Sequence, residues 1–485
     1  MIKGALLFLG FFTVALLVYC NGFHIPYFYD DYEHIFFHPS SEIFKSFFHA
    51  NAYAHFYRPF ERSILAIIQT FWQWNTFPIR IFHLFLHSIG AYFVYHVLRT
   101  WKVNALCSFA GALFLLVSQL SVYAVASNDS QSQIEGALFS AISLWLLYRY
   151  LGNRKENRSK YYLSLLAFFL ALVSKETSAG LLLGIPFVIF AMHKEWVSRV
   201  RQTIKIFLPY GICFGLYFLL RIYAGAGAPS IGNSGYTFYF GINIFRNAGL
   251  LLVQAIVPIS SLSIAQDFFE KDYFRLGVIV IYTAMALLVF GYGLWKSERR
   301  NIIIGLCVLI FCSWIPVLFL NATNELYPYN MVLYLGALFG ISAEYYFVAL
   351  PNRARVAQTA IAIIFIASLL TNIWGTNEKT SGMKELGDRA AAFLPQIISI
   401  APRMPHGSTL YLVNPKTLLF EYSQFSMRGF RVIAGADSIV KYYSNRADFQ
   451  YDLCDSAECI SQMMKHTGIA FTYDVSTLQL YPWHP

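Results

Sequence analysis

The chain has 485 residues, of which 57% are hydrophobic and only 13% are charged. A soluble domain carries about 25% charged residues, so this composition excludes an ordinary soluble enzyme, a disordered chain and a coiled coil. It indicates a polytopic membrane protein, and the formal net charge of +10 is better explained by membrane topology than by binding to nucleic acid.

About 11 apolar segments are long enough, or nearly so, to cross a bilayer. They lie near residues 4–20, 81–98, 105–125, 134–148, 161–173, 178–192, 206–223, 274–295, 302–320, 331–350 and 359–374. Another apolar stretch, 248–264, would reverse the topology of everything after it, so we interpret it as re-entrant or interfacial within a long outer loop, 224–273. The predicted fold is an all-α polytopic membrane protein with about 11 transmembrane helices in residues 1–374.

Lysine and arginine residues are divided unevenly between the two sides of these helices. Seventeen of the 36 fall at Lys3 and in five short alternating loops, namely 99–102, 149–160, 194–205, 296–300 and 353–355. Cytoplasmic loops carry such an excess of positive charge. The N-terminus is therefore predicted to be cytoplasmic, and the segment after residue 374 extracytoplasmic.

The last part of the chain, residues 375–485, has the composition of a soluble domain. Residues 382–400 read as a helix, and residues 408–413 and 468–473 read as strands. We therefore predict a small extracytoplasmic α/β domain. Cys454 and Cys459 lie in a polar stretch of this domain, where an oxidising compartment favours a disulfide between them.

The first outer loop, 21–80, carries the strongest chemical signals. Asp30 and Asp31 are adjacent carboxylates just after the first predicted span, and such a pair can bind a divalent metal or accept a proton from an acceptor hydroxyl. The alternative is that they are solvated loop acids. Arg58, in Tyr57-Arg58-Pro59, can grip a phosphate with two hydrogen bonds, or it is an interfacial arginine.

Two further motifs lie between predicted spans. Lys175 and Glu176 stand between two short apolar runs, where charge is costly, so they are functional candidates or else a mutual ion pair. Glu325 and Tyr327 precede the tenth span, where an interfacial aromatic belt is the alternative. No nucleotide-binding motif and no standard spacing of metal-binding histidines is present.

The order of these motifs resembles the integral-membrane glycosyltransferases of the GT-C superfamily, which includes protein O-mannosyltransferases, TMTC-type transferases and aminoarabinose transferases. The likeness covers roughly residues 1–375 in layout. The strongest local likeness is to TMTC-type proteins, at the motifs Asp30-Asp31, Tyr57-Arg58-Pro59 and Ser174-Lys175-Glu176.

The resemblance implies an inverting glycosyltransferase that takes a sugar from a polyprenyl-phosphate donor, such as an undecaprenyl-phosphate sugar, at the outer face of the membrane. Asp30 or Asp31 would activate the acceptor, and Mg²⁺ or Mn²⁺ could share the pair. Arg58, Lys175 and Tyr327 would bind the donor phosphate, supported by Tyr57, Glu176 and Glu325.

The acceptor expected from this resemblance is a glycan, a lipid or a protein, and a cell-surface polysaccharide such as O-antigen at a bacterial inner membrane is the first choice. Two other functions stay open. One is a flippase or transporter of a lipid-linked sugar, which should carry polar residues near the middle of its spans. The other is an O-antigen ligase or polymerase that uses a diphosphate-linked glycan.

Overall fold

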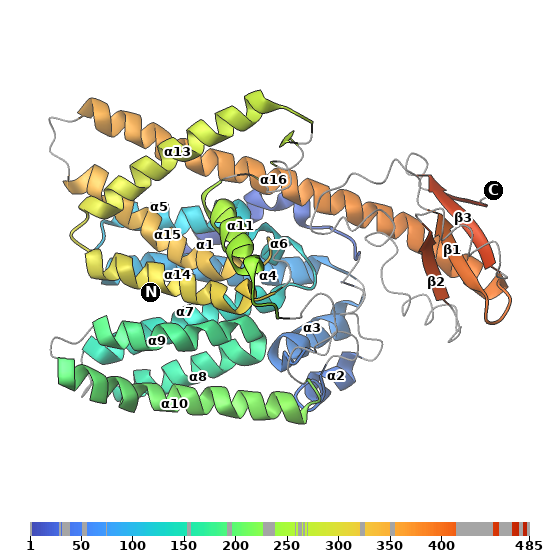
Figure 1. Ribbon diagram of the computed structural model, residues 1–485, viewed down its shortest axis with the longest axis horizontal. Helices are drawn as coiled ribbons and strands as arrows, with labels where there is room; N and C mark the ends of the chain where they lie inside the picture. Colours follow the sequence, from blue (N-terminus) through green and yellow to red (C-terminus); the bar gives the residue numbers. More distant parts are fainter. Residues whose placement is uncertain are drawn as a thin grey trace. The chain divides into compact units, whose positions relative to one another are not determined.

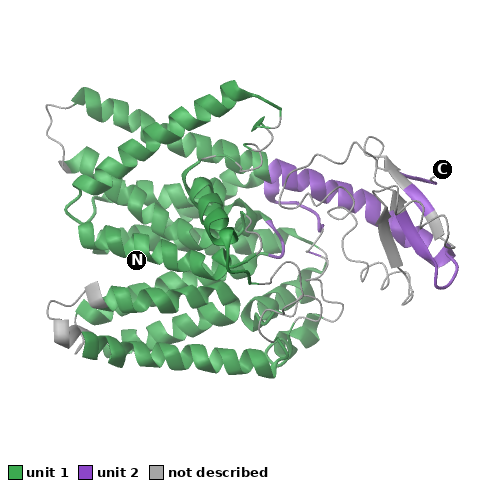
Figure 2. Ribbon diagram, in the orientation of Figure 1, with its two compact units in different colours: residues 1–20, 38–126, 130–379 green, residues 21–37, 127–129, 380–485 purple. Residues whose placement is uncertain are grey.

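The structure is a computed structural model that describes residues 2–28, 31, 39–50, 56–73, 75–152, 157–191, 196–226, 238–257, 259, 264, 267–268, 270–320, 325–349, 355–413, 450–454, 468–474 and 479–482. The chain divides into two compact units (Figure 2). Unit 1 comprises residues 1–20, 38–126 and 130–379, and unit 2 comprises residues 21–37, 127–129 and 380–485.

Unit 1 is built from helices, most of which run side by side (Figure 1). They are α1 (Ile2–Val18), α2 (Pro39–Lys45), α3 (Pro59–Trp72), α4 (Phe77–Thr100), α5 (Ala105–Val117), α6 (Val122–Ala126), α7 (Gln131–Gly152), α8 (Arg158–Ser174), α9 (Gly180–Ala191), α10 (Trp196–Tyr223), α11 (Ile242–Ile256), α13 (Tyr273–Lys296), α14 (Arg300–Leu318), α15 (Tyr329–Glu344) and α16 (Arg355–Ile400). Short 3-10 turns follow α5 (η3, Gln119–Ser121) and α8 (η4, Glu176–Ala179).

All 11 predicted apolar segments are helical over most of their length in the described part of the chain. Six of the described helices are long and apolar enough to cross a membrane, or seven if the pair formed by residues 105–117 and 119–126, bent by 46°, is one span. The membrane-embedded, mainly helical class is thus confirmed, while the count of 11 crossings stays a prediction.

Two helices show how this part of the chain meets the bilayer. On α10, Leu208, Ile212 and Leu219 are exposed, and on α13, Val280 and Leu288 are exposed. Rows of exposed apolar side chains are unfavourable in water, and soluble monomers rarely expose more than a few hundred Å² of contiguous apolar surface. Lipid chains are the surroundings that these side chains fit.

The first part of the stretch interpreted as re-entrant or interfacial, residues 248–256, lies in α11, which has 15 residues. At 1.5 Å per residue such a helix is about 22 Å long, shorter than the hydrocarbon core of a bilayer at about 30 Å. It runs across α14 rather than along it (Figure 1), and Leu251 packs against Val317 and Leu318 there. The side chain of Asn247 donates to the Leu318 carbonyl at 3.2 Å, which satisfies a backbone group at the end of α14.

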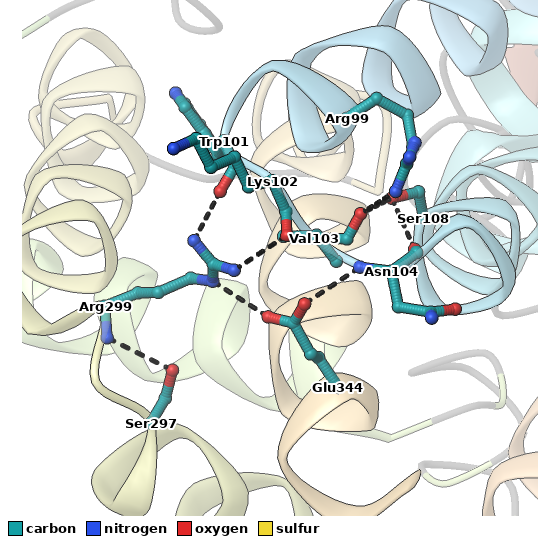
Figure 3. Close-up of polar contacts among 9 residues, drawn as sticks. All are labelled: Arg99, Trp101, Lys102, Val103, Asn104, Ser108, Ser297, Arg299 and Glu344. Atoms are coloured by element: carbon teal, nitrogen blue, oxygen red, sulfur yellow. Dashed lines mark hydrogen bonds and ion pairs between the residues drawn. The ribbon is translucent and has the colours of Figure 1, made fainter. Parts of the chain in front are cut away.

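Two of the basic loops of unit 1, at residues 99–104 and 296–300, are joined by one network, which we call the Arg299–Glu344 clasp (Figure 3). The guanidinium of Arg299 donates from Nε to Glu344 Oε2 at 2.8 Å, and it also donates to the carbonyls of Trp101 and Lys102. The other oxygen of Glu344 accepts from the Asn104 backbone amide at 2.8 Å. One carboxylate of α15 therefore ties together the loop between α4 and α5 and the loop between α13 and α14.

Unit 2 holds the end of α16 and a four-stranded sheet in the order β2-β1-β3-β4. The strands are β1 (Thr409–Val413), β2 (Gln450–Cys454), β3 (Gly468–Asp474) and β4 (Gln479–Pro482); β1 pairs in parallel with β2 and β3, and β3 pairs antiparallel with β4.

The sequence patterns predicted several of these elements. Both predicted strands are present as β1 and β3, and the predicted helix at 382–400 is the last part of α16, which continues across the predicted domain boundary without a break. Its buried residues in unit 2 recur at helical spacing, namely Met383, Leu386, Ala390, Phe393 and Ile397. Cys454 ends β2, but Cys459 lies outside the described residues, so the disulfide stays a prediction.

The predicted orientation has a direct test. A reporter that is active only outside the cytoplasm should give signal when fused after Gly407, and none when fused after Arg300, because the loop that contains Arg300 carries the positive charge of a cytoplasmic loop. A reporter active only in the cytoplasm should give the opposite pattern at both positions. Signal from the Arg300 fusion with the first reporter would reverse the topology.

Candidate active site

A partly buried ion pair joins two of the predicted site residues across 118 positions of sequence. Arg58 donates from Nε to Glu176 Oε2 at 2.8 Å and from Nη2 to Glu176 Oε1 at 2.5 Å, which is the two-bonded geometry that a guanidinium and a carboxylate favour. Lys175 and Arg221 also act on this carboxylate through their charges. We call Arg58, Lys175, Glu176 and Arg221 the cation cluster.

Local structure fixes Arg58 at the start of α3. Pro59 occupies the first turn of that helix, where a missing backbone amide does no harm, and Arg58 precedes it as the N-cap residue. The ring of Phe56 lies 4.0 Å from the centre of the guanidinium, so the cation is held between an aromatic face and a carboxylate. The side chain of Arg58 is only 6% exposed.

The other half of the cluster is set by the break between α8 and α9. Lys175 is extended after the last residue of α8, and Glu176 begins the turn η4. Gly136 of α7 packs directly against this break: a Cβ added there would lie 2.8 Å from the Lys175 Cβ and from the Ser178 hydroxyl. Glycine is therefore required at 136 for α7 to approach Lys175 this closely.

The charge state of Glu176 follows from its neighbours. Burial alone would raise the pKa of its carboxyl, but the positive charges of Arg58, Lys175 and Arg221 and the hydrogen bonds from Arg58 outweigh burial and hold that pKa well below its ordinary value. A carboxyl with a lowered pKa stabilises the folded state above its unfolded-state pKa, near 4.3, and that stabilisation is lost as the pH falls further. At neutral pH, Glu176 is an anion among three cations.

Tyr57 borders the same cluster. Its hydroxyl donates to the Phe47 carbonyl at 3.1 Å, and its ring centre lies 6.0 Å from that of Tyr217. Arg221 in turn donates to the Tyr217 hydroxyl at 3.3 Å. The structure thus brings together Tyr57, Arg58, Lys175 and Glu176 from the sequence prediction, and it adds Arg221, which the sequence analysis had not singled out.

Asp31 belongs to unit 2. It is 3% exposed, and its Oδ2 accepts hydrogen bonds from the Phe28 backbone amide at 3.1 Å and from the Asn128 side chain at 2.8 Å. Asn128 stands in a polar loop 97 residues away, so its role as a partner had no local sequence signal. Asp30 lies outside the described residues.

A second ion pair, in which both side chains are buried, involves Glu325. Its Oε2 accepts from the ammonium group of Lys379, which also donates to the Gln119 side chain and lies 5.1 Å from the ring centre of Tyr123. Lys379 and Glu325 are 3% and 5% exposed. Lys379 was missed by the sequence analysis, because it is separated from Glu325 by 54 positions and follows the end of the predicted span at 359–374.

Tyr327 occupies different surroundings from the cation cluster. It packs in an apolar core with Leu251, Val317, Leu318 and Leu320, where α11 meets the end of α14. Its proposed contact with a donor phosphate stays a prediction. Within the residues that the structure describes, no three His, Cys, Asp or Glu side chains gather as a metal site, and the possible metal at Asp30 and Asp31 stays a prediction as well.

Solved structures of other proteins share this fold. ArnT from Cupriavidus metallidurans, bound to undecaprenyl phosphate, matches with a TM-score of 0.51 and 12% identity over 97% of this chain and 93% of that one. Arabinofuranosyltransferase AftD from Mycobacteria matches with a TM-score of 0.52 and 13% identity, over 92% of this chain and 31% of that one. The structure of the oligosaccharyltransferase AglB from Archaeoglobus fulgidus is a complex with an inhibitory peptide and a dolichol-phosphate. It matches with a TM-score of 0.51 and 10% identity, over 90% of this chain and 64% of that one.

These three likenesses show that the chain has the fold of the GT-C membrane glycosyltransferases. In sequence, residues 59–229 match the family described as dolichyl-phosphate-mannose-protein mannosyltransferase, a match that includes Lys175, Glu176 and Arg221 and begins directly after Arg58. No curated protein matches the sequence. The predicted GT-C fold is thus confirmed.

Proposed function

We propose that the protein transfers a sugar from a polyprenyl-phosphate donor to an acceptor at the outer face of the membrane, with inversion at the sugar carbon. The observation that carries this proposal is the cation cluster, in which Arg58, Lys175 and Arg221 act on one carboxylate at a break between apolar helices. The donor phosphate gains negative charge as the sugar leaves. Cations already held in place lower the energy of that transition state without reorganising.

Two further observations support a donor carried on a lipid. The sequence has no motif for binding a nucleotide sugar, and a donor that reaches the site from the bilayer needs none. The ArnT structure that shares the fold holds undecaprenyl phosphate, and the AglB structure holds a dolichol-phosphate. A carrier of this class is therefore the donor that we assign to the chain.

In this proposal Asp31 serves as the base that takes the proton of the acceptor hydroxyl, with Asp30 as its partner or as a ligand of Mg²⁺ or Mn²⁺. The two hydrogen bonds that Asp31 receives, from Phe28 and Asn128, favour the ionised carboxylate and fix its orientation. A base must be both ionised and oriented to act on a hydroxyl. As acceptor we propose a cell-surface glycan such as O-antigen, with a lipid or a protein as the other choices.

The decisive experiment offers the purified full-length chain two donor classes in lipid nanodiscs. A panel of labelled sugars is supplied on polyprenyl monophosphate and, separately, on polyprenyl diphosphate, each with a cell-surface glycan extract as acceptor. Transfer of label to the acceptor and release of the lipid phosphate are measured. We expect turnover with the monophosphate alone. Turnover with the diphosphate alone would identify a ligase or polymerase, and movement of the intact lipid-linked sugar across vesicles without turnover would identify a flippase.

A further inference from the structure

Besides Glu325, two glutamates of unit 1 are buried outside the cation cluster. Glu61 of α3 and Glu135 of α7 are 2% and 1% exposed. Among the side chains that the structure describes, the charged group that acts most strongly on Glu135 is the carboxylate of Glu61, which is a like charge. Two buried carboxylates that act on each other need either a shared proton or a cation between them.

One oxygen of each carboxylate already has a hydrogen-bond partner. Glu61 Oε1 accepts from the backbone amide of Ser132, in the first turn of α7, at 3.2 Å. Backbone amides in the first turn of a helix favour a negatively charged or electron-rich partner. Glu135 Oε1 accepts from the side-chain nitrogen of Gln131 at 2.5 Å.

Four oxygens of the same four residues are left over. Glu61 Oε2, Glu135 Oε2, Gln131 Oε1 and Ser132 Oγ are all buried without a hydrogen-bond partner among the described residues. Gln131 donates to the Glu135 carboxylate, and the Ser132 backbone amide donates to the Glu61 carboxylate. Because the two carboxylates also act on each other, the four residues form one connected group. A proton shared by the two carboxyls would satisfy two of these oxygens, whereas a cation would satisfy all four.

We propose that Glu61, Gln131, Ser132 and Glu135 form a binding site for one divalent cation of the Mg²⁺, Ca²⁺ or Mn²⁺ class. Oxygen ligands are those that these cations prefer, and two carboxylates balance a charge of +2. The site is separate from Asp30 and Asp31, and it does not rest on the proposed function.

The cation holds α3 to α7, and both helices position the cation cluster. Glu61 lies three residues after Arg58, and Glu135 precedes Gly136, the residue that abuts Lys175. The side chain of Ser174, one position before Lys175, also interacts with Glu135. Occupancy of the site therefore fixes the spacing between the two segments that carry Arg58 and Lys175.

The test uses the full-length chain in detergent, stripped with EDTA and then titrated with Mn²⁺, with bound ion measured by electron paramagnetic resonance. A variant with Asp30→Asn and Asp31→Asn removes the outer-loop carboxylates and should still bind Mn²⁺. Glu135→Gln should weaken binding by at least about tenfold. Gln131→Met keeps both carboxylates and removes only the side-chain amide. We expect it to weaken Mn²⁺ binding as well, while leaving the fold intact.

The matched control is Glu385→Gln, which removes a carboxylate that is 63% exposed on α16 and should leave Mn²⁺ binding unchanged. Equal Mn²⁺ binding by the wild type and by Glu135→Gln would overturn the site. A second pair of results would also overturn the site: the wild type binds no Mn²⁺, and Glu135→Gln unfolds at the wild-type temperature. Those results together would identify a proton shared by the two carboxyls. None of these readouts needs a sugar donor, so failure here leaves the proposed transferase untouched.

Discussion

Replacing Asp31 with Asn is expected to lower the rate of sugar transfer by about 10²–10⁴-fold, the usual contribution of a general base. Asn has the same size, and its side-chain oxygen can still accept from the Phe28 amide and from Asn128, so the local fold should persist. What is lost is the basicity that removes the proton from an acceptor hydroxyl. Initial rates of transfer and the unfolding temperature of the purified chain measure the two effects separately.

The control for this substitution is Asp388→Asn on α16, an exposed carboxylate of the same unit, for which the wild-type rate is expected. The single variant Asp30→Asn reports whether the partner carboxylate is needed. Wild-type transfer by the chain that carries both Asp30→Asn and Asp31→Asn would refute the catalytic assignment.

Loss of either Arg58 or Lys175 is expected to weaken use of the donor. Arg58→Ala removes both hydrogen bonds to Glu176 and leaves that carboxylate without its ion pair, at a cost of about 1–3 kcal/mol in stability. Arg58→Lys keeps the charge but not the forked geometry, so it should recover only part of the loss. Lys175→Arg should be milder than Lys175→Ala, because the positive charge is retained.

The measurement is the dependence of the transfer rate on donor concentration, with KM and kcat reported separately. Arg62→Ala is the control. Arg62 lies in the first turn of α3, four residues after Arg58, and it pairs with Glu42 of α2 at 2.9 Å and not with Glu176. We expect it to change the unfolding temperature and not the donor KM. A donor KM unaffected by both Arg58→Ala and Lys175→Ala would remove the cation cluster from donor binding.

Local sequence patterns predicted the elements well where one run of residues decides the structure. The apolar segments became helices, and alternating or helical spacing located β1, β3 and the last part of α16. The predicted end of the last span, near Trp374, marks where the hydropathy falls. Helix α16 continues beyond it because a stripe of buried residues from Met383 to Ile397 keeps the helical period.

Partners far apart in the chain could not be predicted in this way. The motif residues Arg58, Glu176, Glu325 and Asp31 stand out locally, because charge is rare in so apolar a chain. Their partners are set by how the helices pack, and no spacing rule connects Glu325 with Lys379. The pairing of Arg58 with Glu176 joins two motifs that the sequence analysis had identified separately.

The Arg299–Glu344 clasp bears on whether the bundle could work as a transporter. Alternating access requires a protein to open at each membrane face in turn. To open the basic end, the ion pair of Arg299 and Glu344 and the backbone hydrogen bonds of Trp101, Lys102 and Asn104 would have to separate together. Each hydrogen bond to a charged group contributes about 1.5–3 kcal/mol, so the opened state would be thinly populated. Such a closed end fits a catalyst that works at one membrane face better than it fits a transporter.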